Sequence, residues 1–322
     1  MKILHFINDM DTKGGAEQLV SQYILNDSHE VLTLKYLKYS LFSIKKIYRL
    51  IKFIRKMDLI HVHLFPCFYF GIIFKFIFNK HIVYTEHNSW NRRRKYKVFR
   101  VIERYIYSKY DRITCISKGT KEALIQWIGI NENIILVENG VNLSTNFIKY
   151  PEKRNARKFT LLMIGSFSEQ KNQTLLINYV SKNLGFNLML VGSGPMLIKC
   201  KNLARALNVS DQVYFVEAQT HPIILPYKPD LYVQCSHWEG FGLTVIEAIS
   251  DGIPAIGSAV PGLGNLLENF YSFENNLGSL SRVINKVKSD SNYFSYQKQE
   301  INKYDFDYHL VKLDTVYNDI SS

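Results

Sequence analysis

Strand-like and helix-like segments alternate along this chain in two successive series, and this alternation limits the possible folds more than any other feature of the sequence. In the first half the predicted strands are Lys2 to Ile7, Glu30 to Leu34, Asp58 to His63, His81 to Glu86, Arg112 to Ile116 and Ile134 to Val137. In the second half they are Thr160 to Ile164, Asn187 to Val191, Val213 to Val216, Leu231 to Gln234 and Pro254 to Ile256. Nearly continuous apolar strands separated by helices are typical of parallel sheets that helices cover on both faces. The sequence therefore predicts an α/β fold with parallel sheets.

One polar segment interrupts the alternation. It runs from Asn142 to Lys158, is rich in charged residues and carries Pro151. A chain of 322 residues is long enough for two domains with separate cores. We therefore expect a first domain over residues 1–150 and a second over residues 151–322, joined by this segment. The last amphipathic stretch, about residues 306–320, could pack back on the first domain.

Composition excludes several classes of protein. A hydrophobic content of 47% argues against a disordered or fibrous chain. The longest apolar stretch, Cys67 to Phe78, is interrupted by Lys75 and is shorter than the roughly 20 residues of a spanning helix. The cysteines occur singly, without the paired spacing of a zinc site or a disulfide framework, at Cys67, Cys115, Cys200 and Cys235. This pattern favours a reducing cytoplasm.

The basic charge is confined to the first half. Residues 1–150 hold 24 Lys and Arg against 12 Asp and Glu, whereas residues 151–322 hold 16 of each. A helix predicted from Ile44 to Lys56 has one apolar and one basic side, and Asn91 to Lys97 adds a basic run. A purely structural interpretation is a crossover helix whose apolar side covers the sheet and whose basic side is solvated. The charge also predicts an anionic partner, either a membrane surface or a nucleic acid.

The segment from Glu239 to Glu247 says most about function. It follows the predicted strand Leu231 to Gln234 and leads into a helical pattern, so its Gly-Phe-Gly turn joins a strand to a helix. Free backbone N–H groups and the helix dipole favour an anion at such a turn. The carboxylates of Glu239 and Glu247 would repel a phosphate, so they need other partners, and sugar hydroxyls are suitable donors. The segment therefore predicts a nucleotide-sugar site. A nucleic-acid-binding protein would leave it unexplained.

Two further loops follow predicted strands. Gly14 and Gly15 open a helix after the first strand, where glycine lets a diphosphate or sugar approach the backbone. Lys171 ends the loop that begins at Gly165, where it could neutralise a phosphate. Taken singly, the two glycines are better explained as a tight turn that caps a helix, and Lys171 is equally well explained as a solvated lysine at a helix start.

In this order, the motifs resemble the retaining glycosyltransferases of family 4, which have the GT-B fold of two Rossmann-like domains facing across a cleft. The resemblance covers nearly the whole chain and rests on seven features. They are Gly14 to Glu17, Tyr84 to His87, Ser117 after the strand Arg112 to Ile116, Val137 to Asn142, Lys171, Gly192 to Pro195 and Glu239 to Glu247. It implies transfer of a sugar from a nucleoside-diphosphate sugar to an acceptor hydroxyl with retention of configuration, and it implies no metal ion.

The resemblance also assigns roles. Catalytic roles would fall to His87 beside the reacting carbon, Lys171 at the leaving diphosphate and Glu239 on the donor sugar. Glu247 would hold the ribose hydroxyls. The remaining donor-binding positions would be Gly15, Gly165, Gly240, Phe241, Gly242, Leu243 and Thr244, largely through their backbones. An acceptor linked to a lipid at the inner face of the cytoplasmic membrane would suit the basic first half, as in synthesis of a surface polysaccharide or lipid-linked oligosaccharide.

The chain departs from the family pattern at two positions. Ser166 stands where the family often has Arg, and Asn265 stands where many members carry Glu. Two alternatives therefore stay open: a noncatalytic partner subunit of another transferase, and a GT-B-fold epimerase of the nucleotide sugar. Separately, His61 and His63 lie on one face of a predicted strand and could imitate a metal pair. We expect burial or substrate contact there instead, since no carboxylate or cysteine ligand accompanies them.

Overall fold

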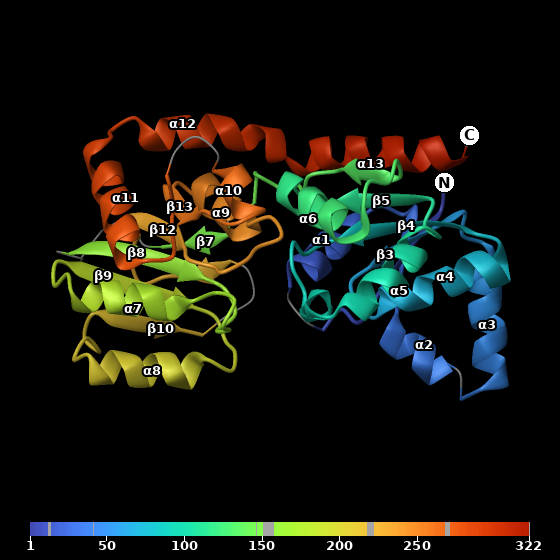
Figure 1. Cartoon of the computed structure of the whole chain (residues 1–322), viewed down its shortest axis with the longest axis horizontal. Helices are drawn as coiled ribbons and strands as arrows, with labels where there is room; N and C mark the ends of the chain where they lie inside the picture. The colour runs from blue at the N-terminus through green and yellow to red at the C-terminus, as the bar shows by residue number, and fades with distance from the viewer. Residues whose placement is uncertain are drawn as a thin grey trace. The chain divides into compact units, whose positions relative to one another are not determined.

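The fold is described from a computed structural model, which describes residues 1–11, 14–40, 42–145, 147–150, 158–217, 222–267 and 271–321. The chain divides into two compact units. The first comprises Met1–Asn139 together with His309–Ser322, and the second comprises Gly140–Tyr308 (Figure 1). The unit boundary lies before the predicted linker, because Val141 N–H donates to the Tyr304 carbonyl of the second unit at 2.8 Å.

A parallel six-stranded sheet forms the centre of the first unit, in the order β2-β1-β3-β4-β5-β6. Its strands are β1 (Ile3–Ile7), β2 (His29–Thr33), β3 (Leu59–His63), β4 (His81–Glu86), β5 (Arg112–Cys115) and β6 (Ile134–Leu136). The helices are α1 (Gly15–Tyr23), α2 (Leu34–Ser40), α3 (Ile44–Arg55), α4 (Cys67–Phe78), the 3-10 helix η1 (Arg92–Lys95), α5 (Lys97–Tyr107) and α6 (Lys118–Ile128). The long last helix, α13 (Phe306–Ser321), joins this unit from residue 309 onward.

The two faces of this sheet differ in chemistry. One face is an apolar core in which strand residues such as Phe6 and Val62 pack with Phe68 of α4 and Tyr107 of α5. The opposite face carries buried histidines, including His5 and His61, which contact Tyr23 of α1 and Tyr317 of α13. Alternate residues of a strand point to opposite faces, which explains how one strand contributes to both.

A second parallel sheet of six strands forms the centre of the other unit, in the order β10-β9-β8-β12-β13-β14. Its strands are β8 (Phe159–Ile164), β9 (Phe186–Val191), β10 (Val213–Val216), β12 (Leu231–Gln234), β13 (Ala255–Ser258) and β14 (Ser272–Phe273). Outside it, β7 (Ile148–Lys149) pairs with β11 (Ile223–Ile224), so the described part of the predicted linker belongs to this unit.

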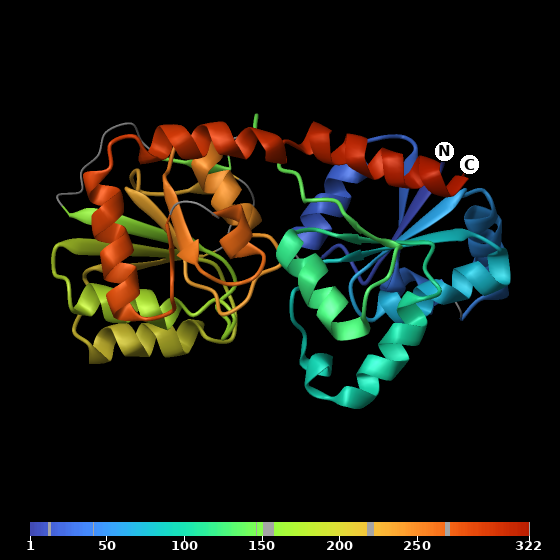
Figure 2. The same ribbon diagram turned by 45° about the horizontal axis from the view of Figure 1, so that its top comes forward.

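Helices flank the second sheet, as Figure 2 shows from another side. They are α7 (Gln173–Ser181), α8 (Leu197–Ala206), α9 (Leu243–Ser250), α10 (Leu263–Leu266), α11 (Leu277–Ser289), α12 (Tyr293–Glu300) and the 3-10 helix η2 (Ile301–Tyr304). The apolar core joins strand residues such as Leu188 and Val233 to Leu176 of α7 and Ile284 of α11. The prediction of parallel sheets covered by helices is confirmed. In the described part of the chain, no helix combines the length and hydrophobicity needed to span a bilayer.

Candidate functional site

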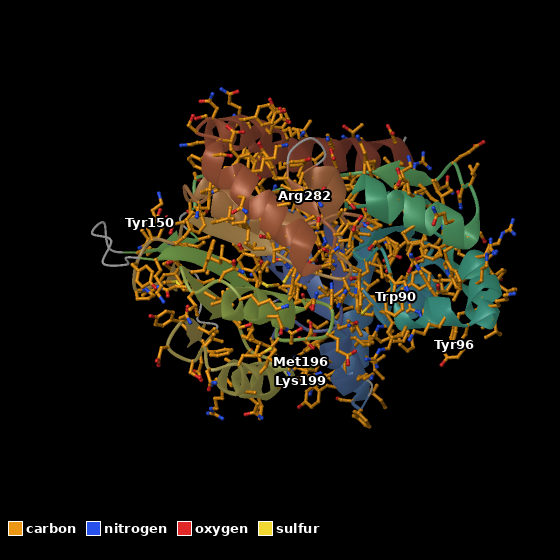
Figure 3. The ribbon with its side chains drawn as sticks, turned by 60° about the vertical axis from the view of Figure 1, so that its left-hand side comes forward. Trp90, Tyr96, Tyr150, Met196, Lys199 and Arg282 are labelled. Atoms are coloured by element: carbon orange, nitrogen blue, oxygen red, sulfur yellow. The ribbon has the colours of Figure 1, made fainter. Side chains whose placement is uncertain are left out.

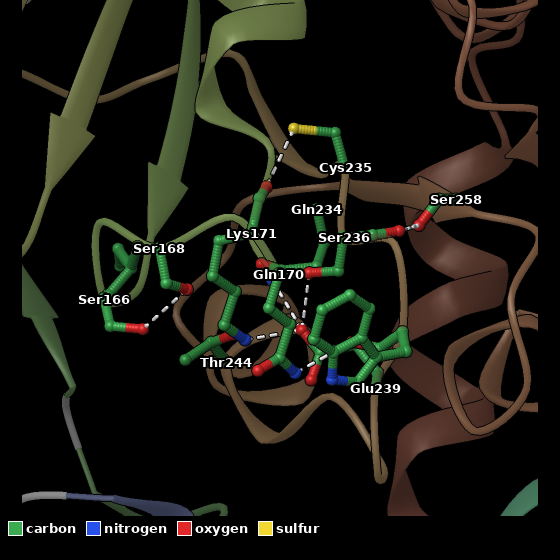
Figure 4. A network of polar contacts seen from close by, with 12 residues as sticks. Ser166, Ser168, Gln170, Lys171, Gln234, Cys235, Ser236, Glu239, Thr244 and Ser258 are labelled. Atoms are coloured by element: carbon green, nitrogen blue, oxygen red, sulfur yellow. Dashed lines mark hydrogen bonds and ion pairs between the residues drawn. The ribbon is translucent and has the colours of Figure 1, made fainter. Parts of the chain in front are cut away.

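The predicted residues Lys171 and Glu239 meet in the second unit (Figure 4). Lys171 lies in the loop between β8 and α7, and Glu239 follows β12. The Lys171 Nζ donates to Glu239 Oε1 at 2.5 Å, and the two side chains are 17% and 8% exposed. Parallel strands β8 and β12 are neighbours in the sheet, so their carboxyl ends bring these loops together. The sequence identified both residues but not their pairing.

Other side chains hold this carboxylate in place. Glu239 Oε1 also accepts from Gln234 Nε2 at 2.9 Å and from Ser236 Oγ at 2.6 Å. Gln234 in turn accepts at its Oε1 from the Tyr232 hydroxyl at 2.6 Å, and that hydroxyl lies 2.8 Å from Thr244 Oγ1. Strand β12 thus connects Glu239 to the first turn of α9 through buried, hydrogen-bonded groups. Such a network fixes the carboxylate orientation.

The Gly-Phe-Gly turn between Glu239 and α9 has the geometry that its glycines allow. Gly242 caps α9 with φ +97°, a left-handed conformation that other residues rarely adopt. Phe241 is buried, and its ring packs edge-on against Tyr304 with centroids 5.3 Å apart. The side chain of Phe241 therefore anchors the turn. The first N–H groups of α9, at Leu243 and Thr244, begin the helix where orphan donors and the dipole favour an anion.

Close backbone contacts shape the loop that carries Lys171. A Cβ at Gly192 would lie 2.0 Å from the carbonyl oxygen of Gly165, so glycine is required there. A Cβ at Gly165 would lie 3.4 Å from Lys171 Cε, so the lysine side chain runs over this glycine. Ser166 is exposed, and its hydroxyl is 3.4 Å from that of Ser168. No cation replaces the missing Arg at this position. Asn265 lies in α10, and its side chain is outside the described part of the chain.

Glu247 is a buried carboxyl group of α9, with 6% exposure. Burial, followed by the nearby charge of Asp251, raises the pKa of Glu247 to about 7. Burial also raises the pKa of Asp251 to about 6, against the opposing effect of the Ile148 and Phe147 backbone N–H groups. Among the described residues, no hydrogen-bond donor contacts the Glu247 carboxyl. This carboxyl is mostly ionised only when the pH exceeds about 7.

A pocket of about 330 Å³ lies in the same unit. Its lining includes Glu169, His237 and Trp238 together with Met196 and Lys199, which lie near one another at the start of α8 (Figure 3). None of the predicted site residues lines it. No pattern in the sequence indicated this pocket, because its walls come from loops after three different strands.

The two predicted site residues of the first half lie in the first unit. Gly15 is the first residue of α1 and is exposed, whereas Thr12 and Lys13 before it lie outside the described residues. His87 comes directly after β4, is 7% exposed, and its Nε2 lies 3.1 Å from His63 Nδ1. Burial, followed by the charge of His309, lowers the pKa of His87 to about 3. His87 is therefore a neutral imidazole at physiological pH.

The suspected metal pair has a third member that the sequence analysis did not single out. Ring nitrogens of His5, His61 and His63 all lie within 4.8 Å of one another. Both ring nitrogens of each already have a hydrogen-bond partner: another histidine, Tyr317 or Thr85. A metal ion would have to break this network, so we interpret the cluster as a hydrogen-bonded one.

Family models cover almost the whole chain. Residues 144–304 match the model of glycosyl transferases group 1, and residues 12–145 match the model of glycosyltransferase family 4. The chain belongs to the group 1 glycosyl transferases. The predicted family is thereby confirmed, and the two models meet close to the boundary between the units.

Relatives of this group 1 glycosyl transferase include proteins of surface polysaccharide synthesis. The O-antigen biosynthesis glycosyltransferase WbnH of Escherichia coli is 28% identical over 225 residues, which are 68% of this chain and 63% of the relative. The lipopolysaccharide 1,6-galactosyltransferase of Escherichia coli K12 is 29% identical over 157 residues, 45% of this chain and 44% of the relative. The matched regions span less than two thirds of these relatives' length.

Solved structures establish the fold of this group 1 glycosyl transferase. Sucrose-phosphate synthase from Thermosynechococcus elongatus has a TM-score of 0.81 at 17% identity, with 99% of both chains covered. HepE from Anabaena, solved in complex with UDP and glucose, has a TM-score of 0.79 at 16% identity, with 99% of this chain and 100% of HepE covered. The predicted GT-B fold is confirmed.

Proposed function

We propose that this chain transfers a sugar from a nucleoside-diphosphate sugar to an acceptor hydroxyl with retention of configuration. The observation that carries the proposal is the hydrogen-bonded Lys171–Glu239 pair, which a network through β12 connects to the first turn of α9, in a chain of this family. A carboxylate accepts hydrogen bonds from sugar hydroxyls, and a lysine with a helix N-terminus binds a diphosphate. The lysine, the carboxylate and the helix N-terminus all lie at the carboxyl edge of one sheet, so the sugar and the diphosphate of a single donor could contact them together.

The chemistry of the donor follows from these residues. As the bond from the sugar to the diphosphate breaks, negative charge develops on the leaving oxygens, and Lys171 and the first N–H groups of α9 stabilise it. Glu239 orients the sugar through its hydroxyls and holds Lys171 in place until the donor binds. Glu247 accepts from the ribose. The transition state is oxocarbenium-like, and the acceptor attacks from the face that the diphosphate leaves.

Uridine diphosphate is the carrier that the comparisons favour. HepE was solved with UDP and glucose, and a relative is named a galactosyltransferase. We therefore propose a UDP-hexose donor and an acceptor of the lipopolysaccharide or O-antigen type. The first domain would bind this acceptor and the second the donor.

A thermal-shift panel of nucleoside diphosphates and their sugars tests the proposal. A ligand at 100 times its dissociation constant stabilises by about 2.7 kcal/mol, which is easily measured. We expect UDP and one UDP-sugar to raise Tm in the wild type and not in Lys171→Ala. The matched control is Lys182→Ala, which removes an exposed lysine at the other end of α7. Loss of the response in both variants, or no response to any nucleotide, would contradict the proposal.

Turnover gives the second test. Removing one charge-stabilising donor typically costs about 10² to 10³ in kcat, so Lys171→Ala should lose at least about 100-fold. Conversion of the donor into an epimeric sugar without any acceptor would instead favour the epimerase, and activity only after coexpression with another transferase would favour the partner subunit.

We also propose that the first unit adheres to anionic membrane. On α3, Lys45, Arg49 and Lys52 are exposed, and so are the apolar side chains Ile44 and Tyr48, at 87% and 67%. The helix buries Leu50 and Ile54 instead, so its apolar side covers the sheet only in part. Basic side chains near an anionic surface contribute about 1 kcal/mol each, and exposed apolar ones can enter the interface.

Vesicle sedimentation tests this attachment. We expect binding to vesicles with 30% anionic lipid at low salt, release at high salt, and loss of binding in the triple variant Lys45→Glu, Arg49→Glu, Lys52→Glu. A triple charge reversal at exposed positions of the second unit, Lys182, Lys199 and Lys201, is the matched control. Equal binding by both variants would contradict an attachment through α3.

A further inference from the structure

One face of strand β12 is polar although it is fully buried. Leu231 and Val233 belong to the apolar core of the second unit, whereas Tyr232 and Gln234 lie on the opposite face of the strand, against α9. The side chains of Tyr232 and Gln234 belong to residues that are 0% exposed. Buried polar groups destabilise a protein unless they are hydrogen-bonded, and apolar residues would pack here without that requirement. The polar face therefore calls for an explanation other than packing.

The hydrogen bonds around Gln234 allow only one orientation of its amide (Figure 4). Its Nε2 lies 2.9 Å from Glu239 Oε1, and an ionised carboxylate can only accept. The same nitrogen lies 2.9 Å from Ser236 Oγ, which gives its own proton to Glu239 Oε1 at 2.6 Å and so accepts from the amide. Both amide protons are thereby used. The Oε1 atom of Gln234 remains as an acceptor that needs a donor.

The Tyr232 hydroxyl supplies that donor. It lies 2.6 Å from Gln234 Oε1, nearer than to the Ile164 carbonyl at 3.2 Å, and it has a single proton. Thr244 Oγ1, 2.8 Å from the same hydroxyl, is then the donor of the second bond. Burial raises the pKa of Tyr232, so the hydroxyl keeps its proton. Donation runs in one direction, from Thr244 through Tyr232 and Gln234 to the carboxylate of Glu239, and we call these four side chains the β12 network.

The β12 network determines which oxygen of Glu239 can hold a sugar. Oε1 accepts from Lys171 Nζ at 2.5 Å as well as from Gln234 and Ser236. Three donors fill the capacity of one carboxylate oxygen, which has about two lone pairs. The hydroxyl groups of a donor sugar must therefore be accepted by Oε2. Because Oε1 is held from three directions, Oε2 has one fixed position relative to the first turn of α9.

We propose that Tyr232 and Gln234 are positioning residues that set the selectivity of this site for the hydroxyl pattern of the donor sugar. The inference rests on the proposed function, because it requires a sugar nucleotide whose diphosphate lies at the N-terminus of α9. That helix fixes the diphosphate end of the donor, and the β12 network fixes Oε2 at one distance from it. A sugar with a hydroxyl at that distance meets the carboxylate. An epimer that presents this hydroxyl on the other side of the ring does not.

A positioning role and a purely structural role have different consequences. If the β12 network only stabilises the second unit, loss of one of its hydroxyls weakens the binding of every donor to the same extent, or not at all. If it positions Glu239, the same loss lets the carboxylate turn toward hydroxyls in other directions. The ratio of affinities between two donors then changes, while the affinity for the nucleotide without a sugar stays the same. Selectivity is therefore the quantity to measure.

Calorimetry measures this selectivity without any transfer of sugar. The ligands are UDP, UDP-glucose, UDP-galactose and the monodeoxy forms of whichever of the two sugars binds more tightly. In the wild type, removal of the hydroxyl that Glu239 accepts should weaken binding about 10- to 100-fold, the effect of one hydrogen bond to a charged group. In Tyr232→Phe the same removal should weaken binding less than about 3-fold, since the carboxylate is no longer held in one direction. UDP alone should bind both proteins with affinities within about 2-fold.

Tyr293→Phe is the matched control. The Tyr293 hydroxyl is also buried in the second unit, but it donates to the Ala255 carbonyl and lies 2.8 Å from Gln297 Nε2, at the amino end of β13. Its removal should leave the selectivity of the wild type unchanged. In the β12 network itself, Thr244→Val removes the outermost donor and should lower the selectivity, and Thr244→Ser, which keeps the hydroxyl, should restore it.

The results distinguish this inference from the proposed function. A wild type that binds neither UDP nor a UDP-sugar rejects the proposed function, and the inference with it. A wild type that binds these ligands supports the donor site. The inference alone is then rejected if all monodeoxy forms bind the wild type equally, if a folded Tyr232→Phe keeps the full selectivity, or if Tyr293→Phe loses as much. Should Tyr232→Phe not fold, Gln234→Met, which removes the middle of the β12 network, must show the same loss of selectivity.

Discussion

Acidification should unfold the first unit while it stabilises the second. Five histidines of the first unit have rings withdrawn from water and pKa values below the ordinary one: His5, His61, His63, His87 and His309. In the unfolded chain each takes up a proton near pH 6.5, whereas in the folded unit His309 does so at about 4 and His87 at about 3. The stability that the first unit gains from keeping these five rings neutral is complete above pH 6.5. It is lost as the pH falls from 6.5 toward the lower pKa values of the folded unit.

The size of the loss follows from linkage. At pH 5.5, one unit below the pKa in the unfolded chain, each histidine that stays neutral in the folded unit lowers the free energy of unfolding by about 1.4 kcal/mol relative to pH 8. The five histidines together lower it by about 7 kcal/mol, which is comparable with the 5 to 15 kcal/mol that ordinarily stabilises a domain. Glu247 acts in the opposite direction, because its pKa of about 7 lies above the ordinary 4.5. Its protonation should stabilise the second unit by about 2 kcal/mol at pH 5.5.

Urea unfolding with pulsed amide exchange, analysed by mass spectrometry, measures both units in one sample. For peptides from β1 and β3, the urea concentration at the unfolding midpoint should fall steeply between pH 7.5 and 5.5. For peptides from α9, this midpoint should stay constant or rise over the same range. His61→Gln should reduce the loss in the first unit by about 1.4 kcal/mol. His81→Gln, whose side chain is 52% exposed, should not change it. If the free energy of unfolding of the first unit in the wild type falls by less than about 2 kcal/mol, the reasoning is refuted, because five rings that stay neutral must lower it by more.

Three further predictions concern the second unit. Affinity for a UDP-sugar, measured by calorimetry, should fall about tenfold between pH 8 and pH 6 as Glu247 gains a proton, and Glu247→Gln should give a flat profile. Gly192→Ala places a Cβ against the Gly165 carbonyl and should lower the free energy of unfolding, measured in urea, by about 2 to 4 kcal/mol. The control Gly185→Ala, whose Cβ meets nothing within 4 Å, should change that free energy by less than about 0.5 kcal/mol. Glu239→Ala removes the shared acceptor of Lys171 Nζ, Gln234 Nε2 and Ser236 Oγ and should cost about 1 to 3 kcal/mol of stability as well as turnover, while an active, equally stable variant would place the sugar elsewhere.

The strands were the most predictable part of this protein. His81–Glu86, Val213–Val216 and Leu231–Gln234 have the predicted bounds, because buried parallel strands are short apolar runs between clear breaks. The two-residue strand β14 was missed, since Ser272–Phe273 has too few residues to show a pattern. Pairing by β7 was also missed, because it depends on a partner 75 residues along the chain.

The candidate site was predictable only as a set of separate residues. Glu239 and Lys171 each lay in a recognisable loop, but their contact depends on β8 and β12 being neighbours, which no local pattern reveals. The contacts among the buried histidines His29, His5, His63 and His87 were still harder to predict, because a shift of one residue in any strand register would send a ring to the opposite face. A usable signal was present all the same: histidine recurs in β1, β2 and β3 at positions where buried strands ordinarily carry aliphatic residues.

The placement of α13 affects the order in which the protein can be made. A ribosome releases residues 1–139 first, yet the unit that they form also contains residues 309–322. Until that segment emerges, Tyr23 lacks His309 and His61 lacks Tyr317, so the histidine-bearing face of the sheet stays open to water. The second unit is contiguous and can close earlier, although its sequence comes later. Synthesis should therefore leave the older half of the chain exposed to chaperones until the final helix arrives.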